Sequence, residues 1–309
     1  MSELVTQKKP NAIFLMGPTA SGKTALAIAL RQHLPVEIIS VDSALIYRGM
    51  DIGTAKVSPE QQAEVPHHLL DILDVTQDAS VSEYQSSARA LIDEIHGRGR
   101  TPIIVGGSGL YVRAATDLMN FPGTDPAMRA RLEGIAEAGA LHDMHAMLEE
   151  LDPKAASTIK PTDARRIVRA LEVIALTGDT FSSELPEYTY FTPTIQVGLA
   201  QDRETLHQRI ADRVHLMWDA GWVDEVRTLL DQGLRDGKTA RHAIGYAQII
   251  DYLDDKMSAD LAIDSTVTRT RQFAKRQETW FRRDPRIQWF DAADPHTPQN
   301  ALDYIKETA

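Results

Sequence analysis

The chain has 309 residues, of which 43% are hydrophobic and 25% are charged, and its formal net charge is −11. Ordinary globular proteins have this composition, so it excludes wholesale disorder and predicts a sizeable core. Cysteine is absent, which excludes disulfides, cysteine-based zinc sites and a thiolate nucleophile.

The residues before the first predicted strand lack the apolar stretch of a secretory signal. The longest early apolar run, from Ala12 to Met16, is too short to cross a membrane. Such a short, wholly apolar run is typical of a buried strand in a parallel sheet. We therefore expect a soluble, cytoplasmic protein without membrane contacts.

Strand and helix signals then alternate, as they do in βαβ units on a parallel sheet. A glycine-rich turn over 17–24 precedes a predicted helix over 25–32, and a second strand is predicted over 36–41. Apolar residues between 84 and 95 follow a helical spacing, with Ser82 as the predicted N-cap and glycines at 97 and 99 as its end. A third strand is predicted over 102–105.

The pattern changes near residue 120. The stretch 127–178 reads as mostly helical, with breaks at Asp152-Pro153 and Lys160-Pro161. A strand over 194–199 is expected to return to the sheet, and helical patterns follow around 203–230, 243–253 and 264–282. The interpretation is an α/β core over 1–119 and 194–309, ending in basic helices, with a helical insertion over 120–193.

The turn after the first strand matches the P-loop pattern G-x-x-x-x-G-K-[ST] in the strand-to-helix context that the motif requires. Backbone N–H groups of such a loop surround phosphate oxygens, and the helix N-terminus adds partial positive charge. The lysine contacts the terminal phosphate, and the final hydroxyl is placed to ligate Mg²⁺. The fold class is therefore P-loop NTPase-like, with phosphate-binding residues Gly17, Pro18, Thr19, Ala20, Ser21, Gly22, Lys23 and Thr24, the last also being the metal ligand.

Many P-loop enzymes that hydrolyse nucleotides place an Mg²⁺-binding Asp after a later apolar strand. Here the strand over 102–105 is followed by Gly106-Gly-Ser-Gly109, which argues against a motor or switch NTPase. Asp42 follows the second strand, at the sheet edge where parallel sheets bind ligands. It is a candidate general base or Mg²⁺ partner, and the alternative is an ordinary turn cap.

The segment 269–283 carries six basic residues and one acidic residue, Glu278, within an otherwise acidic chain. Such concentrated charge favours a helix that contacts a polyanion, and the alternative is a solvated helix face. Trp280 and Trp289 are interpreted as core residues. His67 and His68 are interpreted as structural, because metal sites usually need more ligands.

Several blocks together resemble the bacterial tRNA dimethylallyltransferases, also called tRNA isopentenyltransferases. They occur in the family's order over nearly the whole chain. The blocks are GPTASGKT from 17, DSALIYRGMDIGTAK from 42, PHHLLDI from 66, GGSGLY from 106, DARRIVRALEV from 163, RIADR from 209 and the basic segment 269–283.

The resemblance implies transfer of a dimethylallyl group from dimethylallyl diphosphate to N6 of adenine 37 in tRNA. The P-loop would hold the diphosphate with Mg²⁺, and Asp42 would be the general base. Ser108, where the family commonly has threonine, would lie near the reacting centre, and Arg213 would help to hold the diphosphate. The implied partners are the donor and the tRNA anticodon stem-loop, with no obligate protein partner, and a monomer is expected.

The resemblance also implies four groups of tRNA contacts. The basic helix, with Arg271 and Lys275, would follow the RNA backbone. The alternative for the insertion arginines is pairing with Glu172 or Asp163 on the same helix. The arginine common in bacterial members is Ala247 here, so its contact is missing. The other predicted contacts are Asp42, Ser43, Ala44 and Leu45; Arg166, Ile167, Val168, Arg169 and Ala170; and Arg241, His242, Ala243, Ile244, Gly245 and Tyr246.

Two other functions remain open on the residues alone. One is a small-molecule or nucleoside kinase that uses ATP at the same P-loop, which predicts ADP release. The other is a non-catalytic P-loop module that binds RNA, for which Asp42→Ala would leave every activity intact.

Overall fold

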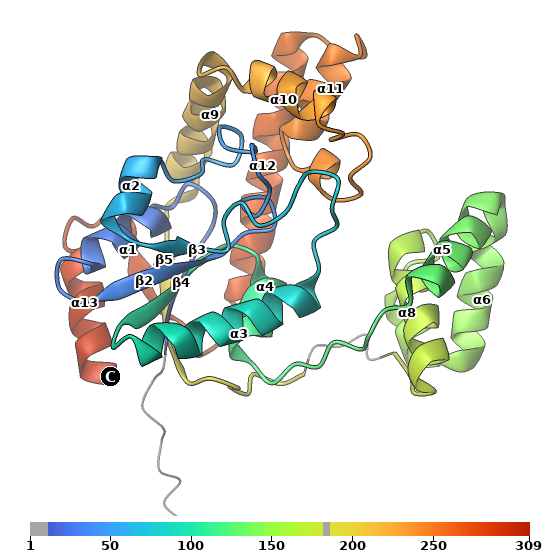
Figure 1. Ribbon diagram of the computed structural model, residues 1–309, viewed down its shortest axis with the longest axis horizontal. Helices are drawn as coiled ribbons and strands as arrows, with labels where there is room; N and C mark the ends of the chain where they lie inside the picture. The colour runs from blue at the N-terminus through green and yellow to red at the C-terminus, as the bar shows by residue number, and fades with distance from the viewer. Residues whose placement is uncertain (1–11, 182–185) are drawn as a thin grey trace, which may run out of the picture. The chain divides into compact units, whose positions relative to one another are not determined.

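A computed structural model describes residues 12–181 and 186–309. Within these residues the strands form one parallel sheet in the order β3-β2-β4-β1-β5-β6 (Figure 1). The predicted α/β fold class is therefore confirmed. The strands are β1 (Ala12–Met16), β2 (Val36–Val41), β3 (His67–His68), β4 (Thr101–Gly106), β5 (Thr194–Ala200) and β6 (Gln288–Asp291).

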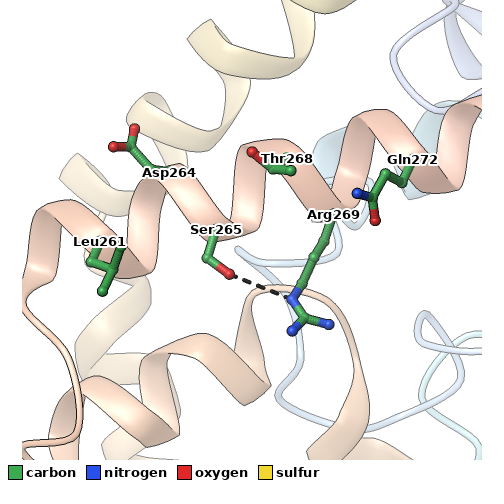
Figure 2. A pocket seen from close by; sticks show the side chains of 6 residues that line it. All are labelled: Leu261, Asp264, Ser265, Thr268, Arg269 and Gln272. Carbon is green, nitrogen blue, oxygen red and sulfur yellow. Dashed lines mark hydrogen bonds between the residues drawn. The ribbon is translucent and has the colours of Figure 1, made fainter.

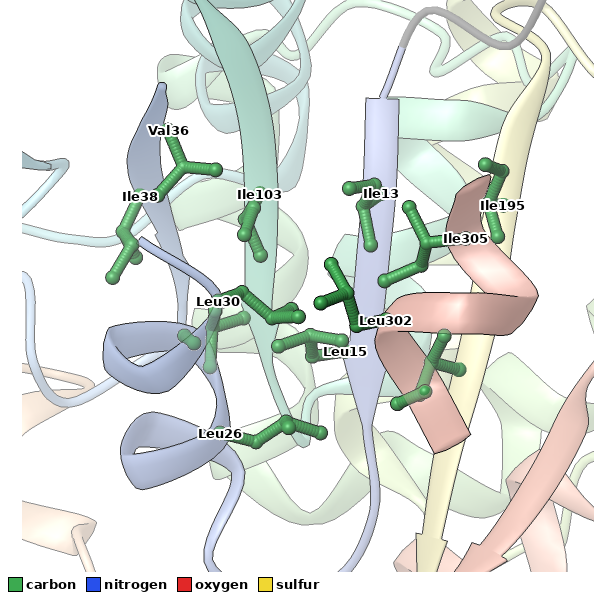
Figure 3. Close-up of a cluster of buried hydrophobic side chains, with 14 of the residues drawn as sticks. Ile13, Leu15, Leu26, Leu30, Val36, Ile38, Ile103, Ile195, Leu302 and Ile305 are labelled. Atoms are coloured by element: carbon green, nitrogen blue, oxygen red, sulfur yellow. The ribbon is translucent and has the colours of Figure 1, made fainter. Parts of the chain in front are cut away.

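Helices cover both faces of this sheet, which is why β1 and β2 are buried along their whole length. Alternate residues of β1 enter two different cores. Ile13 and Leu15 pack with α1 (Lys23–Leu30) and α13 (Thr297–Thr308), as Figure 3 shows. Phe14 packs on the opposite face with residues of α3 (Val81–Gly97) and α4 (Gly109–Thr116).

The C-terminal half of the core unit adds a helical layer near the P-loop. Its helices are α9 (Arg203–Asp219), α10 (Trp222–Asp231), α11 (Tyr246–Leu253) and α12 (Ala259–Phe281), with a short 3-10 turn η2 (Ala240–His242). Gly221, at a φ of 95°, separates α9 from α10, where the sequence predicted one continuous helical stretch. A small helix, α2 (Pro59–Glu64), lies between β2 and β3.

The chain divides into two compact units, Met1–Leu118 with Tyr190–Ala309, and Met119–Thr189. The predicted insertion ran over 120–193, but residues 190–193 belong to the core unit. Tyr190 forms a bridge with Asp117, and the N–H groups of Phe191 and Thr192 both donate to the carbonyl oxygen of Thr116.

The second unit is helical and has its own core. Met144 and Leu148 pack there against Ile167 and Leu171. Its buried Glu172 accepts hydrogen bonds from Arg129, Arg169 and the backbone of Asp125. The elements are α5 (Pro126–Ile135), a π-helical turn η1 (Ala136–Ala140), α6 (Leu141–Leu151), α7 (Pro153–Thr158) and α8 (Ala164–Thr177).

One predicted cap was wrong. Ser80, not Ser82, is the N-cap of α3, and its hydroxyl accepts a hydrogen bond from the N–H of Glu83. Ser80 and Glu83 have the spacing of a capping box, a signal that the interpretation overlooked. The helix therefore starts at Val81.

Candidate active site

Strand register brings the three predicted motifs to one edge of the sheet. Met16 pairs with Gly106 in β4, and Gly106 also pairs with Val41 in β2. The three strands therefore end side by side. The P-loop follows β1, Asp42 follows β2, and the turn that starts at Gly107 follows β4. This is the carboxyl edge, where parallel sheets bind ligands.

The P-loop is built by close packing against its neighbours. A Cβ on Gly17 would lie 2.7 Å from the carbonyl oxygen of Leu199 in β5, so only glycine fits there. Gly22 adopts a φ of 90° as the N-cap of α1. Ala20 packs against the apolar cluster that α9 and α12 form. The first N–H groups of α1 lack intrahelical partners, which makes the loop suited to an anion.

Charged groups converge at this loop. Nζ of Lys23 donates to the carbonyl oxygens of Gly17, at 3.0 Å, and Pro18, at 2.7 Å. Burial lowers the pKa of Lys23 to about 8; the charge of Asp42 opposes that shift, and the charge of Arg213 adds to it. Asp42 and Arg213 therefore both lie within electrostatic reach of the P-loop lysine.

Asp42 is half-buried directly after β2. Burial raises the pKa of its carboxyl group, while hydrogen bonds from the backbone of Ala44 and Leu45 and the charge of Lys23 act in the other direction. The N–H of Ala44 donates to Oδ1 of Asp42 over 2.8 Å, so the carboxylate also caps the turn that follows β2. A raised pKa suits a general base, because such a group accepts a proton more readily.

Ser108, Thr24 and Arg213 have side chains available to a ligand. Ser108 is the N-cap residue of α4 but makes no capping hydrogen bond through its side chain. Thr24 is exposed. Within residues 12–181 and 186–309, neither hydroxyl makes a hydrogen bond, and Arg213 forms no ion pair. Burial lowers the pKa of Arg213, but an arginine remains charged.

Sequence reasoning missed Gln277 in α12. Its Oε1 accepts the N–H of Thr19 over 2.9 Å, and its Nε2 donates to the carbonyl oxygen of Gly107 over 3.1 Å. The only signal was its position: Gln277 shares a helical face with Ala274 and Phe281, which are buried. Next to it, Trp280 fills the space beside Gly109, where a Cβ would come within 2.1 Å of the indole.

Sequence reasoning also missed Glu225 in α10. Its carboxylate accepts the N–H groups of Asp51, Ile52 and Gly53 and the hydroxyl of Tyr246. These contacts fix the loop that follows Asp42. Two cations of the same loop are also paired: Arg48 with Asp74, and the buried Lys56 with two carboxylates, Asp51 and Asp71.

Several predicted RNA contacts have side chains that pack inside the protein. In the insertion, the side chains of Ile167, Val168 and Ala170 are buried in that unit's core. In the core unit, Gly245 and Tyr246 are buried, and a Cβ on Gly245 would lie 1.8 Å from the Trp222 ring. Among the other residues of those two segments, Ala243 and Ile244 are half-buried and His242 is exposed.

The predicted arginine contacts are partly occupied. Arg169 donates to Glu172 and to the carbonyl oxygens of Pro122 and Gly123, and Arg166 lies 3.6 Å from Asp163. The alternative of pairing within the helix is therefore confirmed for both. Arg241 donates to the carbonyl oxygen of Arg235, and its guanidinium remains exposed.

Helix α12 presents its charges unevenly. Arg271 is half-buried and donates to the carbonyl oxygen of His207, whereas Lys275 and Arg276 are exposed. Earlier in the helix, a hollow is lined by residues of the exposed face, among them Asp264 and Arg269, which carry opposite charges (Figure 2). The surplus of positive charge is thus confined to the second half of α12.

The histidines and tryptophans have structural roles, as predicted. Nδ1 of His67 lies 2.7 Å from the carbonyl oxygen of Val65, and Nε2 of His68 lies 2.7 Å from Glu37. Trp280 and Trp289 pack against the core on the α3 face. Across the described parts of the chain, no cluster of three His, Cys, Asp or Glu residues could hold a metal. Nor does any described helix have the length and apolar character needed to cross a membrane.

Comparisons with known proteins agree on one family. The family model described as IPP transferase matches residues 45–284. The chain is 56% identical over 290 residues to a protein of Thermobifida fusca (strain YX) named tRNA dimethylallyltransferase, with 91% of each chain covered. A protein of the same name from Pseudarthrobacter chlorophenolicus is 54% identical, with 93% of this chain and 95% of that one covered.

Two solved structures are also similar. One is the full-length tRNA isopentenylpyrophosphate transferase of Bacillus halodurans, with 39% identity, a TM-score of 0.73 and 97% of each chain covered. The other is a eukaryotic dimethylallyltransferase acting on tRNA, with 26% identity and a TM-score of 0.82. That match covers 96% of this chain and 80% of the eukaryotic one.

Proposed function

The chain belongs to the IPP transferase family, and we propose that it transfers a dimethylallyl group from dimethylallyl diphosphate to N6 of adenine 37 in tRNA. It is a prenyltransferase that acts on tRNA, as the relatives' shared name states. The observation that carries the finer proposal is the register that sets the P-loop, Asp42 and the Gly107-Ser108 turn at one sheet edge. The P-loop, as an anion site, and Asp42, as a base, would then act on the same pair of substrates.

The P-loop would hold the donor's diphosphate through its N–H groups. Charge accumulates on this group as the allylic carbon–oxygen bond breaks. Lys23 and Arg213 would stabilise that charge where it develops, which is the electrostatic contribution expected of such a site. The lowered pKa of Lys23 supports this role, because a partly buried ammonium gains most from an anionic partner.

The adenine would enter as an unstacked base, since its exocyclic amine cannot be reached inside the anticodon-loop stack. N6 forms the new bond to C1 of the dimethylallyl group, diphosphate leaves, and Asp42 takes the N6 proton. Ser108 follows the adjacent strand β4, and its hydroxyl would lie near the reacting atoms. The hydrogen bond from Ala44 fixes one carboxylate oxygen of Asp42 and so sets the orientation of the base.

The residues present fit an Mg²⁺ ion. Thr24 offers an exposed hydroxyl at the P-loop position that usually ligates the metal, and Mg²⁺ needs few protein ligands when phosphate oxygens supply the rest. The ion would neutralise diphosphate charge. We infer that the RNA partner is the anticodon stem-loop, that Lys275 and Arg276 contact its backbone, and that the protein acts in the cytoplasm as a monomer.

Diphosphate release separates this proposal from the kinase alternative. The protein would be given dimethylallyl diphosphate, Mg²⁺ and an anticodon stem-loop, and the released diphosphate would be measured against the RNA added. A stem-loop with inosine at position 37 has no exocyclic amine and serves as the control. One diphosphate per adenine-containing RNA, and none with inosine, supports the proposal. ADP release from ATP with a small acceptor instead would contradict it.

A further inference from the structure

Gln277 joins two turns of the site through one buried side chain. It is 6% exposed, and its carboxamide lies between the P-loop and the turn that follows β4. Oε1 accepts the N–H of Thr19, and Nε2 donates to the carbonyl oxygen of Gly107. The P-loop and the β4 turn are therefore held at a fixed separation by a residue of α12.

A carboxamide suits this position because one turn offers a hydrogen-bond donor and the other offers an acceptor. Thr19 offers a donor and Gly107 offers an acceptor, so the bridging side chain needs one of each at its end. The amide of Gln277 also explains why residue 107 is a glycine. A Cβ at position 107 would lie 2.0 Å from Nε2 of Gln277, although the backbone there has no positive φ to explain a glycine.

We propose that Gln277 is a positioning residue that fixes the P-loop in its diphosphate-binding shape. Gln277 accepts the hydrogen bond from the N–H of Thr19. It thereby sets the orientation of the peptide group before Thr19, and so of the loop that continues to Lys23. In this role Gln277 would contact neither the donor nor the RNA. The inference rests on the proposed function, because it assigns diphosphate to the loop.

Binding of inorganic diphosphate tests the inference without any transfer reaction. Affinity would be measured by calorimetry with Mg²⁺ for the full chain and for Gln277→Met, which keeps the length but neither hydrogen bond. We expect about ten- to a hundredfold weaker diphosphate binding, because two buried groups lose their partners and the loop shifts. Anticodon stem-loop affinity should stay within about twofold. Gln299→Met is the matched control, since the exposed side chain of Gln299 donates to Asp303 one turn further along α13 and, among the described residues, makes no other hydrogen bond.

The outcomes are distinct. Unchanged diphosphate affinity in Gln277→Met would overturn the inference, and so would a parallel loss of RNA affinity, because that would indicate a general structural role. If the unsubstituted chain itself fails to bind diphosphate, the diphosphate assignment of the proposed function fails, and the inference fails with it.

A double-mutant cycle keeps the inference testable if Gln277→Met folds poorly. Gly107→Ala should weaken diphosphate binding by crowding the amide, and Gln277→Ala should weaken it by removing the bridge. If the two residues act through one contact, Gly107→Ala adds little in the Gln277→Ala background. Additive losses would show that Gly107 is required for another reason and would overturn the inference.

Discussion

The hydroxyl of Tyr246 donates a 2.6 Å hydrogen bond to Oε1 of Glu225, and the same carboxylate accepts three backbone N–H groups of residues 51–53. One side chain therefore connects α10, α11 and the loop that follows the proposed base. Trp222 completes the contact, because it leaves room only for glycine at positions 53 and 245. The loop that follows Asp42 and the start of α11 are therefore parts of one packed unit.

Glu225→Ala should destabilise this unit. Four donors would lose their acceptor, so we expect the free energy of unfolding to fall by about 3 kcal/mol, measured by urea denaturation. Asp224→Ala is the control. Asp224 is exposed and forms an ion pair with the equally exposed Arg227, so its loss should cost less than about 0.5 kcal/mol. Equal destabilisation by both variants would show that the loop does not depend on Glu225.

Asp42→Asn should separate catalysis from binding. The amide keeps an oxygen for the N–H of Ala44 but cannot act as a base, so the single-turnover rate should fall by about 10² to 10⁴. Diphosphate and stem-loop affinities, measured on the same preparation, should change by less than about threefold. Transfer at a near-normal rate would remove Asp42 from the chemistry.

The pH dependence of kcat/KM for the donor should be bell-shaped. Asp42 must be ionised to accept a proton, so activity rises with pH through its raised pKa. Lys23 must be protonated to bind diphosphate, so activity falls above its pKa of about 8. In Lys23→Arg the alkaline limb should disappear from whatever activity remains, because arginine stays charged. A limb that persists in this variant belongs to another group.

RNA binding should depend on salt through the second half of α12. Lys275→Gln is expected to reduce the slope of log Kd against log salt by about 0.7 to 0.9, the value for one phosphate contact. Lys306→Gln, at an exposed position of α13, should leave the slope unchanged. Arg271 is a poorer probe than the sequence indicated, because its guanidinium already donates to the backbone of His207. An unchanged slope in Lys275→Gln would place this residue outside the interface.

The sequence predicted what depends on local pattern. The strands β1 and β2 occur at their predicted residues, since short apolar runs next to turns carry a strong local signal. The P-loop could also be placed, because its spacing reflects its own backbone geometry. The register of parallel strands then brings Asp42 and Ser108 to the same edge, as the alternation of strands and helices indicated.

What the sequence could not predict depends on contacts between distant segments. Gln277 meets Thr19 only because α12 packs beside the P-loop, and its place on the buried face of the helix does not by itself indicate that contact. The same holds for Glu225 and the loop it fixes. The sequence interpretation started α12 at 264, whereas the helix starts at Ala259, because it overlooked Ser258 as the N-cap, whose hydroxyl accepts the N–H of Leu261. The short strands β3 and β6 have too few residues for a periodic signal.

The mass of the RNA product tests the central claim most directly. The purified protein would be incubated with Mg²⁺, dimethylallyl diphosphate and an unmodified anticodon stem-loop containing adenines at 36, 37 and 38, followed by mass spectrometry of RNA fragments. We expect one added C5H8 unit, located on adenine 37, and none with Asp42→Asn in the same time. An unchanged RNA mass, with ATP consumed on a small acceptor instead, would contradict it.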